Sequence, residues 1–150
     1  MTAIPGPFDP RTMLLPKHAQ HVALVHFPIA LFISAVALDA AAHWTKGRGW
    51  LDAAYYNFTL AAVSGPPVLV TGVLAWLFAL EGERLKGVLL SHLLLGALST
   101  VLISLIWWMH FRARRRSVVP PAYRFAAEFT AVFLVTLTGH LGGFLSGVNH

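Results

Sequence analysis

Four long apolar runs constrain the fold of this 150-residue chain more than any other feature. They begin near His21, Tyr55, Val88 and Tyr123, and each has the length of roughly 20 residues that an α-helix needs to cross a bilayer. Charged residues make up only 11% of the chain, against about 25% in an average soluble domain. The sequence therefore predicts an integral membrane protein without room for a separate soluble domain.

We expect transmembrane helices at about residues 21–42, 55–80, 88–109 and 123–145. They form one domain, residues 21–150, after an extramembrane N-terminal tail at residues 1–20. The tail is rich in proline and has no long apolar run, which argues against a cleavable signal peptide. Gly65-Pro66-Pro67 is expected to interrupt the second helix with a kink. Short connections make successive helices antiparallel, so the predicted fold is all-α, an up-down-up-down four-helix bundle.

Basic residues are distributed unevenly between the two ends of this bundle. The end that carries both termini has four of them, Arg11, Lys17, Arg84 and Lys86. The opposite end has seven, Lys46, Arg48, Arg112, Arg114, Arg115, Arg116 and Arg124. Because loops rich in Lys and Arg stay in the cytoplasm, we predict a multi-pass protein of the bacterial inner membrane with both termini periplasmic. The arginines are expected to contact lipids, and no nucleic acid is expected as a partner.

Several kinds of chemistry are excluded by what the chain lacks. It has no cysteine, which excludes disulfides, thiolate-held zinc, iron–sulfur clusters held by cysteine and covalently attached c-type haem. The sequence shows no nucleophile–base pair, no phosphate-binding loop and no pair of carboxylates converging on the histidines. We therefore predict no catalytic residues, and a subunit of a larger complex rather than an independent enzyme.

Three of the predicted helices each carry one histidine at a similar depth. His26, His92 and His140 lie about five residues from a helix end, or roughly 7 Å along the axis, on the side of the termini. An ionisable side chain at such a depth is a functional-site hypothesis by default. Imidazole is a ligand for iron, copper and zinc. We predict that these three side chains converge and bind a metal.

Histidines at one depth on three helices favour a b-type haem as the metal centre. Small residues such as Gly96 and Gly143 share a helix face with His92 and His140, which would leave a slot for a flat macrocycle. Haem iron takes two axial imidazoles from facing helices of a bundle. The candidate cofactor-binding residues are His21, His26, His92 and His140, with Arg84 and Lys86 for the propionates. One haem is expected, and two would fit because His21 and His26 point to different sides of their helix.

Other interpretations of the same residues stay open. Gly139, Gly143 and Gly147 form a small-residue pattern that by itself predicts only close helix packing, and histidine can bond across helices without a metal. Copper at the outer mouth is an alternative to haem, with His18, His21, His26 and His150 as ligands. Two acids have simpler expectations. Asp39 is expected to pair with a loop arginine or to cap the bundle rather than to conduct protons, and Glu128 is expected to be paired or solvated close to the interface.

The opening of the first apolar run resembles a known motif. The matching residues are His21, Val25-His26-Phe27-Pro28-Ile29-Ala30-Leu31 and Asp39, followed later by Thr71-Gly72, His92 and Gly142-Gly143. They resemble a large bacterial membrane family, the domain of unknown function twenty-two thirty-one, over about residues 20–147. Val22 stands where that family usually has a proline. The resemblance implies a four-helix fold like that of the small membrane cytochromes b, and a redox role, since some relatives are joined to cytochrome c modules.

The predicted function is a membrane electron-transfer subunit that holds b-type haem near the periplasmic face. Its partners would be other membrane subunits and a periplasmic cytochrome c or quinone. The alternative is a non-catalytic structural or assembly subunit of a respiratory or photosynthetic complex, in which the same residues serve only protein and lipid contacts.

Overall fold

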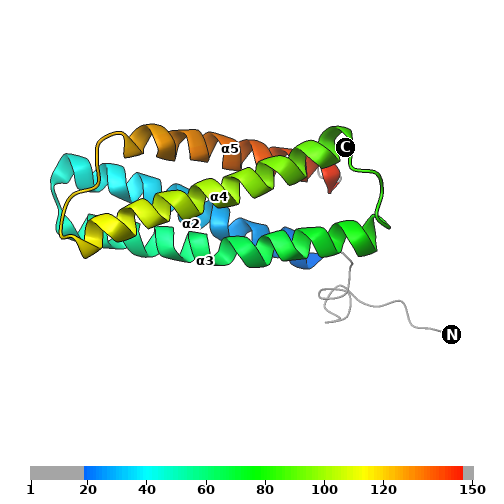
Figure 1. Ribbon diagram of the computed structural model, residues 1–150, viewed down its shortest axis with the longest axis horizontal. Helices are drawn as coiled ribbons and strands as arrows, with labels where there is room; N and C mark the ends of the chain where they lie inside the picture. The colour runs from blue at the N-terminus through cyan, green and yellow to red at the C-terminus, as the bar shows by residue number, and fades with distance from the viewer. Residues whose placement is uncertain (1–18, 147–150) are drawn as a thin grey trace.

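The computed structural model describes residues 19–146, which form four helices and no strand. The helices are α2 (Ala19–Thr45), α3 (Arg48–Ala79), α4 (Gly87–Arg115) and α5 (Arg124–Leu145). Each is long and apolar enough to cross a membrane. Successive helices run in opposite directions (Figure 1). The prediction of an all-α, up-down-up-down membrane bundle is confirmed.

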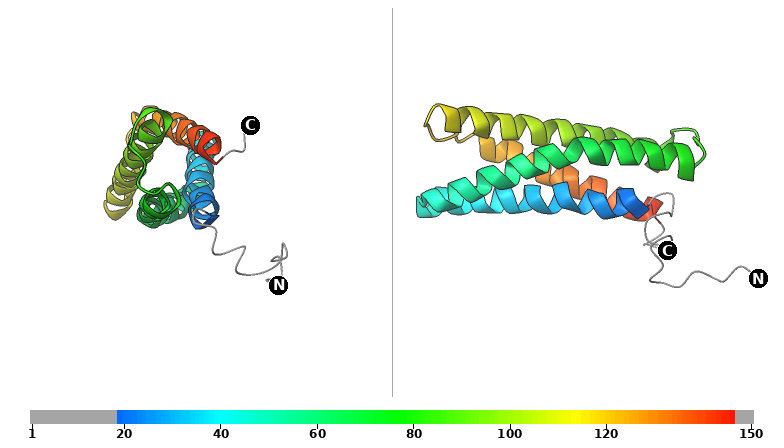
Figure 2. Two further views of the ribbon diagram at one scale, coloured as in Figure 1. Left: turned by 90° about the vertical axis from the view of Figure 1, so that its right-hand side faces the viewer. Right: turned by 90° about the horizontal axis from the view of Figure 1, so that it is seen from below.

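The four helices form a ring around a common axis (Figure 2). Each packs against its two neighbours in the order α2, α3, α4 and α5, with α5 returning to α2. Helices α2 and α4 therefore face each other across the bundle. The start of α2, the end of α5 and the connection between α3 and α4 share one end, which we call the terminal end (Figure 1). The opposite end, which we call the basic end, is formed by the connection between α2 and α3 and the connection between α4 and α5.

Three helices extend further than the hydropathy pattern indicated. Helix α2 ends at Thr45 rather than near Ala42, and α3 begins at Arg48 rather than near Tyr55, so only Lys46 and Gly47 connect them. Helix α4 continues to Arg115 rather than ending near Met109. A helix of 32 residues is about 48 Å long, against about 30 Å of hydrocarbon. The helices therefore continue into the headgroup region, where arginines in the last turn of α4 also stabilise the negative end of its dipole.

The prolines of α3 do not interrupt it. Pro66 and Pro67 lie inside a helix that is continuous from Arg48 to Ala79, so no break occurs there, while the predicted kink stays a prediction. A Cβ at Gly65 would lie 2.9 Å from Cγ2 of Thr100, which shows how closely α4 approaches α3 at this point. Membrane helices tolerate proline where a neighbouring helix supports the backbone. Helix packing therefore overrides the local preference against proline.

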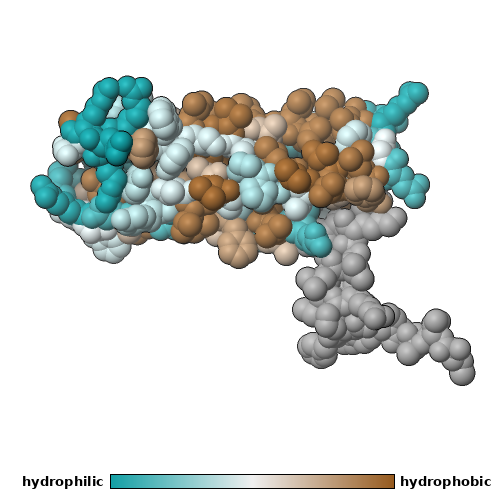
Figure 3. Space-filling model, turned by 60° about the horizontal axis from the view of Figure 1, so that its bottom comes forward, coloured by the Kyte–Doolittle hydropathy of each residue, from teal (hydrophilic) through white to brown (hydrophobic). Residues whose placement is uncertain are grey.

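The core of the bundle is narrow and made mostly of small side chains. Its buried apolar residues are Phe32, Ala35, Val36, Ala54, Phe58, Ala61, Ala62, Ile103, Ile106, Ala131 and Val135. Large apolar side chains instead cover the outside, as Phe133 and Val63 do with 67% and 65% of their surface exposed. Hydrophobic residues cover much of the flank while hydrophilic residues gather at the two ends (Figure 3). This distribution suits a bundle whose flank faces lipid.

Candidate functional site

Two groups of polar side chains lie inside the bundle, one toward each end. The first, which we call the histidine pair, consists of His21 and His92 near the terminal end. The second, which we call the polar cluster, consists of Asp39, His110, Arg124 and Glu128 near the basic end. Both are built from helices that are far apart in sequence, so each depends on the assembled bundle.

The histidine pair joins the two helices that face each other across the bundle. His21 comes from α2 and His92 from α4, and their ring centroids are 6.3 Å apart with the ring planes at 83°. Both side chains are half-buried. The sequence predicted both residues as cofactor-binding, and the structure brings these two imidazoles together.

Hydrogen bonds fix the orientation of each imidazole. Nδ1 of His92 donates to the carbonyl oxygen of Thr138 at 3.0 Å, because a carbonyl can only accept. Nδ1 of His21 lies 3.2 Å from Oγ1 of Thr71, and that hydroxyl already donates to the carbonyl of Val68. Nδ1 of His21 is therefore the donor there. With the hydrogen on Nδ1, the neutral form of each ring keeps a lone pair on Nε2, the arrangement of a metal-binding histidine.

Each ring of the histidine pair lies against a glycine. A Cβ added at Gly72 would be 3.0 Å from Cε1 of His21, and one added at Gly142 would be 3.0 Å from Cε1 of His92. Real Cβ atoms rarely approach so closely, so each ring occupies the space that a side chain would need. Gly72 and Gly142 therefore pack against the rings of the histidine pair. Both belong to the motifs of the family resemblance, Thr71-Gly72 and Gly142-Gly143.

The structure does not bring His26 and His140 to this pair. Both are exposed: Nδ1 of His26 donates to the carbonyl of Val22 at 2.7 Å, and the His140 ring lies 5.0 Å from the ring of Phe144. His26 follows His21 by five residues, a rotation of about 140° around the helix, so only one of the two can face inward. Equal depth had suggested that His26, His92 and His140 converge, but depth does not fix the direction of a side chain.

The other predicted site residues at the terminal end have different positions. Arg84 and Lys86 are exposed in the connection between α3 and α4. Their role toward propionates stays a prediction. His18 and His150, named for the copper alternative, lie outside the described residues.

The polar cluster is built around one ion pair and one histidine–carboxylate contact. Nε of Arg124 donates to Oδ2 of Asp39 at 2.6 Å, and Nε2 of His110 lies 2.9 Å from Oε1 of Glu128. Arg124 also donates to the carbonyl oxygens of Pro120 and Pro121 at 3.0 and 3.4 Å. Asp39 pairs with an arginine as expected, although Arg124 belongs to α5 rather than to a loop. Glu128 is paired as well, but it is completely buried rather than solvated at the interface.

The polar cluster is almost completely enclosed. Asp39 and Glu128 are 0% exposed, Arg124 is 2% exposed and His110 is 3% exposed. The Phe58 ring of α3 lies 4.4 Å from the His110 ring, so all four helices contribute to the enclosure. Two carboxylate oxygens there, Oδ1 of Asp39 and Oε2 of Glu128, have no hydrogen-bond partner. Ligand-type atoms of Asp39, His110 and Glu128 lie within 4.8 Å of one another.

Sequence reasoning treated the members of the polar cluster separately. Arg124 was counted only as one of the basic residues at the basic end, and His110 was given no role. One signal was present in the sequence: Arg124 and Glu128 are four residues apart, so they share a face of α5. An acid at position 39 within an apolar run was the other signal, since such a group needs a partner inside the bundle.

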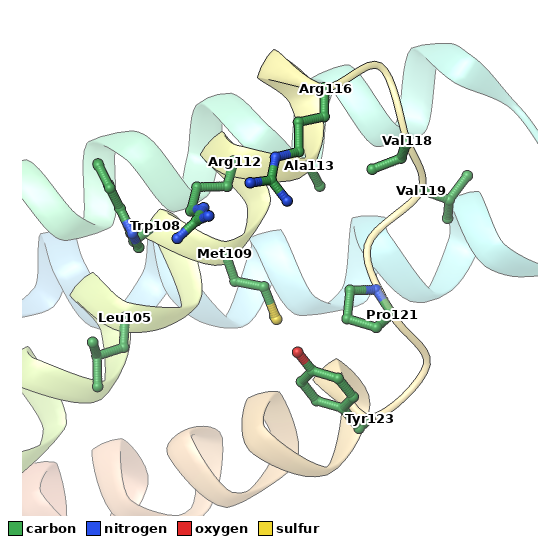
Figure 4. A pocket seen from close by; sticks show the side chains of 10 residues that line it. All are labelled: Leu105, Trp108, Met109, Arg112, Ala113, Arg116, Val118, Val119, Pro121 and Tyr123. Atoms are coloured by element: carbon green, nitrogen blue, oxygen red, sulfur yellow. The ribbon is translucent and has the colours of Figure 1, made fainter.

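A groove of about 390 Å³ opens at the basic end, beside the polar cluster. It is lined by Leu105, Trp108, Met109, Arg112, Ala113, Arg116, Val118, Val119, Pro121 and Tyr123. Arg112 and Arg116 extend from α4 above Met109, and the hydroxyl of Tyr123 points toward Met109 (Figure 4). Met109 and Pro121 adjoin His110 and the carbonyl of Pro120, so the groove runs along the outer side of the segments that hold the cluster.

One comparison with known proteins bears on identity. The model of a family described as "Predicted membrane protein (DUF2231)" matches residues 17–149, which covers nearly the whole chain. No curated protein and no solved structure matches the chain. The resemblance drawn from the opening motif is therefore confirmed.

Proposed function

Since the chain belongs to the DUF2231 family of predicted membrane proteins, we propose that it is a membrane electron-transfer subunit that holds a b-type haem iron with His21 and His92. The histidine pair carries this proposal. Two imidazoles on opposite sides of one ion have ring centroids about 6 Å apart, given metal–nitrogen bonds of about 2 Å. The separation of 6.3 Å between His21 and His92 agrees with that value.

The chain's own residues fit the requirements of such a centre. Thr71 and the carbonyl of Thr138 hold the Nδ1 hydrogens, which fixes the rings and leaves Nε2 of each as the ligand atom. Gly72 and Gly142 let both rings sit against the backbone. When bound, haem would supply one-electron transfer. Arg84 and Lys86, at the same end, are the candidates for holding its propionates.

The glycines of the histidine pair give a first prediction. Gly142→Ala should move the His92 ring by several tenths of an ångström and lower haem occupancy at least several-fold, because ligand geometry must hold within about 0.5 Å. Gly139→Ala is the matched control on the same helix, since its Cβ would lie at an ordinary 3.5 Å from Cδ1 of Ile29. Haem content per chain measures both. Equal haem content in the two variants would contradict the role given to Gly142.

The proposed orientation puts the histidine pair near the periplasm, within reach of a cytochrome c or a quinone. Arg124 is buried, so six exposed basic residues remain at the basic end: Lys46, Arg48, Arg112, Arg114, Arg115 and Arg116. At the terminal end, the structure describes two basic residues, Arg84 and Lys86. Two more, Arg11 and Lys17, belong to the N-terminal segment that comes before the described residues. The positive-inside rule still favours a cytoplasmic basic end in the bacterial inner membrane.

Single-cysteine labelling tests this orientation, because the chain has no cysteine of its own. Glu83→Cys, in the exposed connection at the terminal end, should react with a membrane-impermeant maleimide added to intact spheroplasts. Val119→Cys, 71% exposed at the basic end, should react only after the membrane is opened. The reverse pattern would contradict the periplasmic position of the termini.

A structural or assembly subunit is the second candidate, and one observation favours it. The rings of the histidine pair lie so close to Gly72 and Gly142 that they also fasten α2 to α3 and α4 to α5 without any metal. Elemental analysis of the purified protein separates the candidates. Iron at about one per chain supports haem, copper supports the alternative metal, and a metal-free protein that co-purifies with other membrane subunits supports the structural role.

A further inference from the structure

We propose that the polar cluster binds one exchangeable proton, held between Oδ1 of Asp39 and Oε2 of Glu128. This proposal does not depend on haem, since the cluster lies at the opposite end of the bundle from the histidine pair. The two oxygens are the buried side-chain atoms that have no hydrogen-bond partner in the described part of the chain. Their residues come from α2 and α5 and are both completely buried.

The charges of the polar cluster require a cation. With Asp39 and Glu128 ionised, Arg124 positive and His110 neutral, the cluster carries one net negative charge. An unbalanced charge enclosed in an apolar span is costly, and a buried acid takes up a proton instead. Helix α3 contributes the ring of Phe58 to the cluster, a side chain that carries no charge. One bound proton makes the cluster neutral.

The unpartnered oxygens determine where that proton lies. Oδ2 of Asp39 already accepts from Arg124, and Oε1 of Glu128 already faces Nε2 of His110. A proton on either free oxygen turns it into a donor and lets the other accept, so a single proton satisfies both atoms. A proton on His110 would balance the charge equally well but would leave both oxygens unpartnered. One carboxylate oxygen of Asp39 and one of Glu128 lie within 4.8 Å of each other, so the two acids are neighbours and a hydrogen bond between them requires their side chains to move closer.

A divalent metal ion suits the cluster less well, although two carboxylates and an imidazole could supply ligands. The guanidinium of Arg124 is bound to one of those carboxylates and would repel a second cation. A divalent ion would also leave the enclosed cluster with one net positive charge. A proton brings the charge of the cluster to zero.

Infrared spectroscopy of the full-length protein in lipid nanodiscs tests the proposal. At neutral pH the wild type should show a C=O stretching band of a protonated carboxylic acid, and the band should shift when the buffer is exchanged for D₂O. Asp39→Asn and Glu128→Gln should each lose the band, because removing either carboxylate charge makes the cluster neutral without the proton. Arg124→Gln should strengthen the band about twofold, since two protons are then needed.

A variant of an exposed carboxylate serves as the control for the infrared band. Asp52→Asn removes a half-exposed carboxylate at the same end and should leave the band unchanged. The wild-type measurement stands even if a variant fails to fold. A wild type without the band overturns the proposal, as does one whose proton resides on His110 as an imidazolium in ¹⁵N NMR spectra. Stoichiometric binding of Zn²⁺ or Mn²⁺ that Asp39→Asn abolishes also overturns it.

Discussion

His92→Ala should remove the absorption bands of bound haem from the purified protein. His92 supplies one of the two imidazoles of the proposed centre, and its Nδ1 is already engaged by Thr138. Without this ring the iron would lose one axial ligand, and the cofactor would lose the contact that ties it to α4. We expect haem content to fall at least tenfold, measured as haem per chain in protein purified from haem-supplemented cells. His21→Ala should behave in the same way.

Two other histidines serve as matched controls for that experiment. His26 and His140 lie at a similar depth but are exposed on the outside of the bundle. His26→Ala and His140→Ala should therefore keep the spectrum of the wild type. Loss of haem in His140→Ala with retention in His21→Ala would contradict the proposed ligand pair and would restore the layer expected from depth alone.

Arg124→Leu should destabilise the protein strongly. It removes the guanidinium from a completely buried Asp39 and leaves the carbonyls of Pro120 and Pro121 without their donor. Breaking a buried ion pair by removing one partner typically costs roughly 3–5 kcal/mol, because the remaining charge is enclosed and unpaired. Thermal or denaturant unfolding in detergent, followed by circular dichroism, measures the change in the free energy of unfolding.

An exposed ion pair at the same end provides the control. Arg114 contacts Asp52 and lies over the Tyr55 ring, but both charged side chains are largely open to the surroundings. Arg114→Ala should change the free energy of unfolding little, since such pairs contribute little when exposed. The double variant Asp39→Asn, Arg124→Leu should recover much of the lost stability. Equal losses in Arg124→Leu and Arg114→Ala would contradict the structural importance of the buried pair.

The two polar groups are expected to act nearly independently. His92 and His110 are 18 residues apart on α4, which corresponds to about 27 Å at 1.5 Å per residue. Two unit charges at that distance interact by about 0.6 kcal/mol at an effective dielectric constant of 20. Variants of the polar cluster should therefore leave the haem spectrum unchanged, so the failure of one proposal does not decide the other.

The helices were predictable because hydrocarbon thickness sets their length. Charged residues such as Asp39 and Glu128 are so few within the apolar runs that the runs remain recognisable in the sequence. The antiparallel order of the helices followed from the short connections between them. The ends were less predictable, since Arg48, Tyr55 and Arg115 are good interfacial residues that a helix can include after it leaves the hydrocarbon. Hydropathy therefore indicated which residues of each helix lie in the hydrocarbon, and the structure showed how far each helix continues beyond it.

The candidate sites were only partly predictable, for a geometric reason. Depth in the membrane follows from counting residues, and it grouped His26, His92 and His140 near one end, whereas the structure pairs His92 with His21. The direction of a side chain depends on how each helix is rotated in the bundle, which the weakly amphipathic runs around His26 and His140 do not specify. The polar cluster joins Asp39 to Arg124, which are 85 residues apart in sequence, so its contacts needed the assembled fold.

The reduced-minus-oxidised absorption spectrum of the purified wild-type protein tests the central claim most directly. The protein should show a Soret band and sharp α and β bands on reduction, with about one haem per chain, if His21 and His92 hold the cofactor as proposed. A protein that stays colourless and iron-free after haem supplementation, while its circular dichroism shows an intact helical bundle, would contradict the claim.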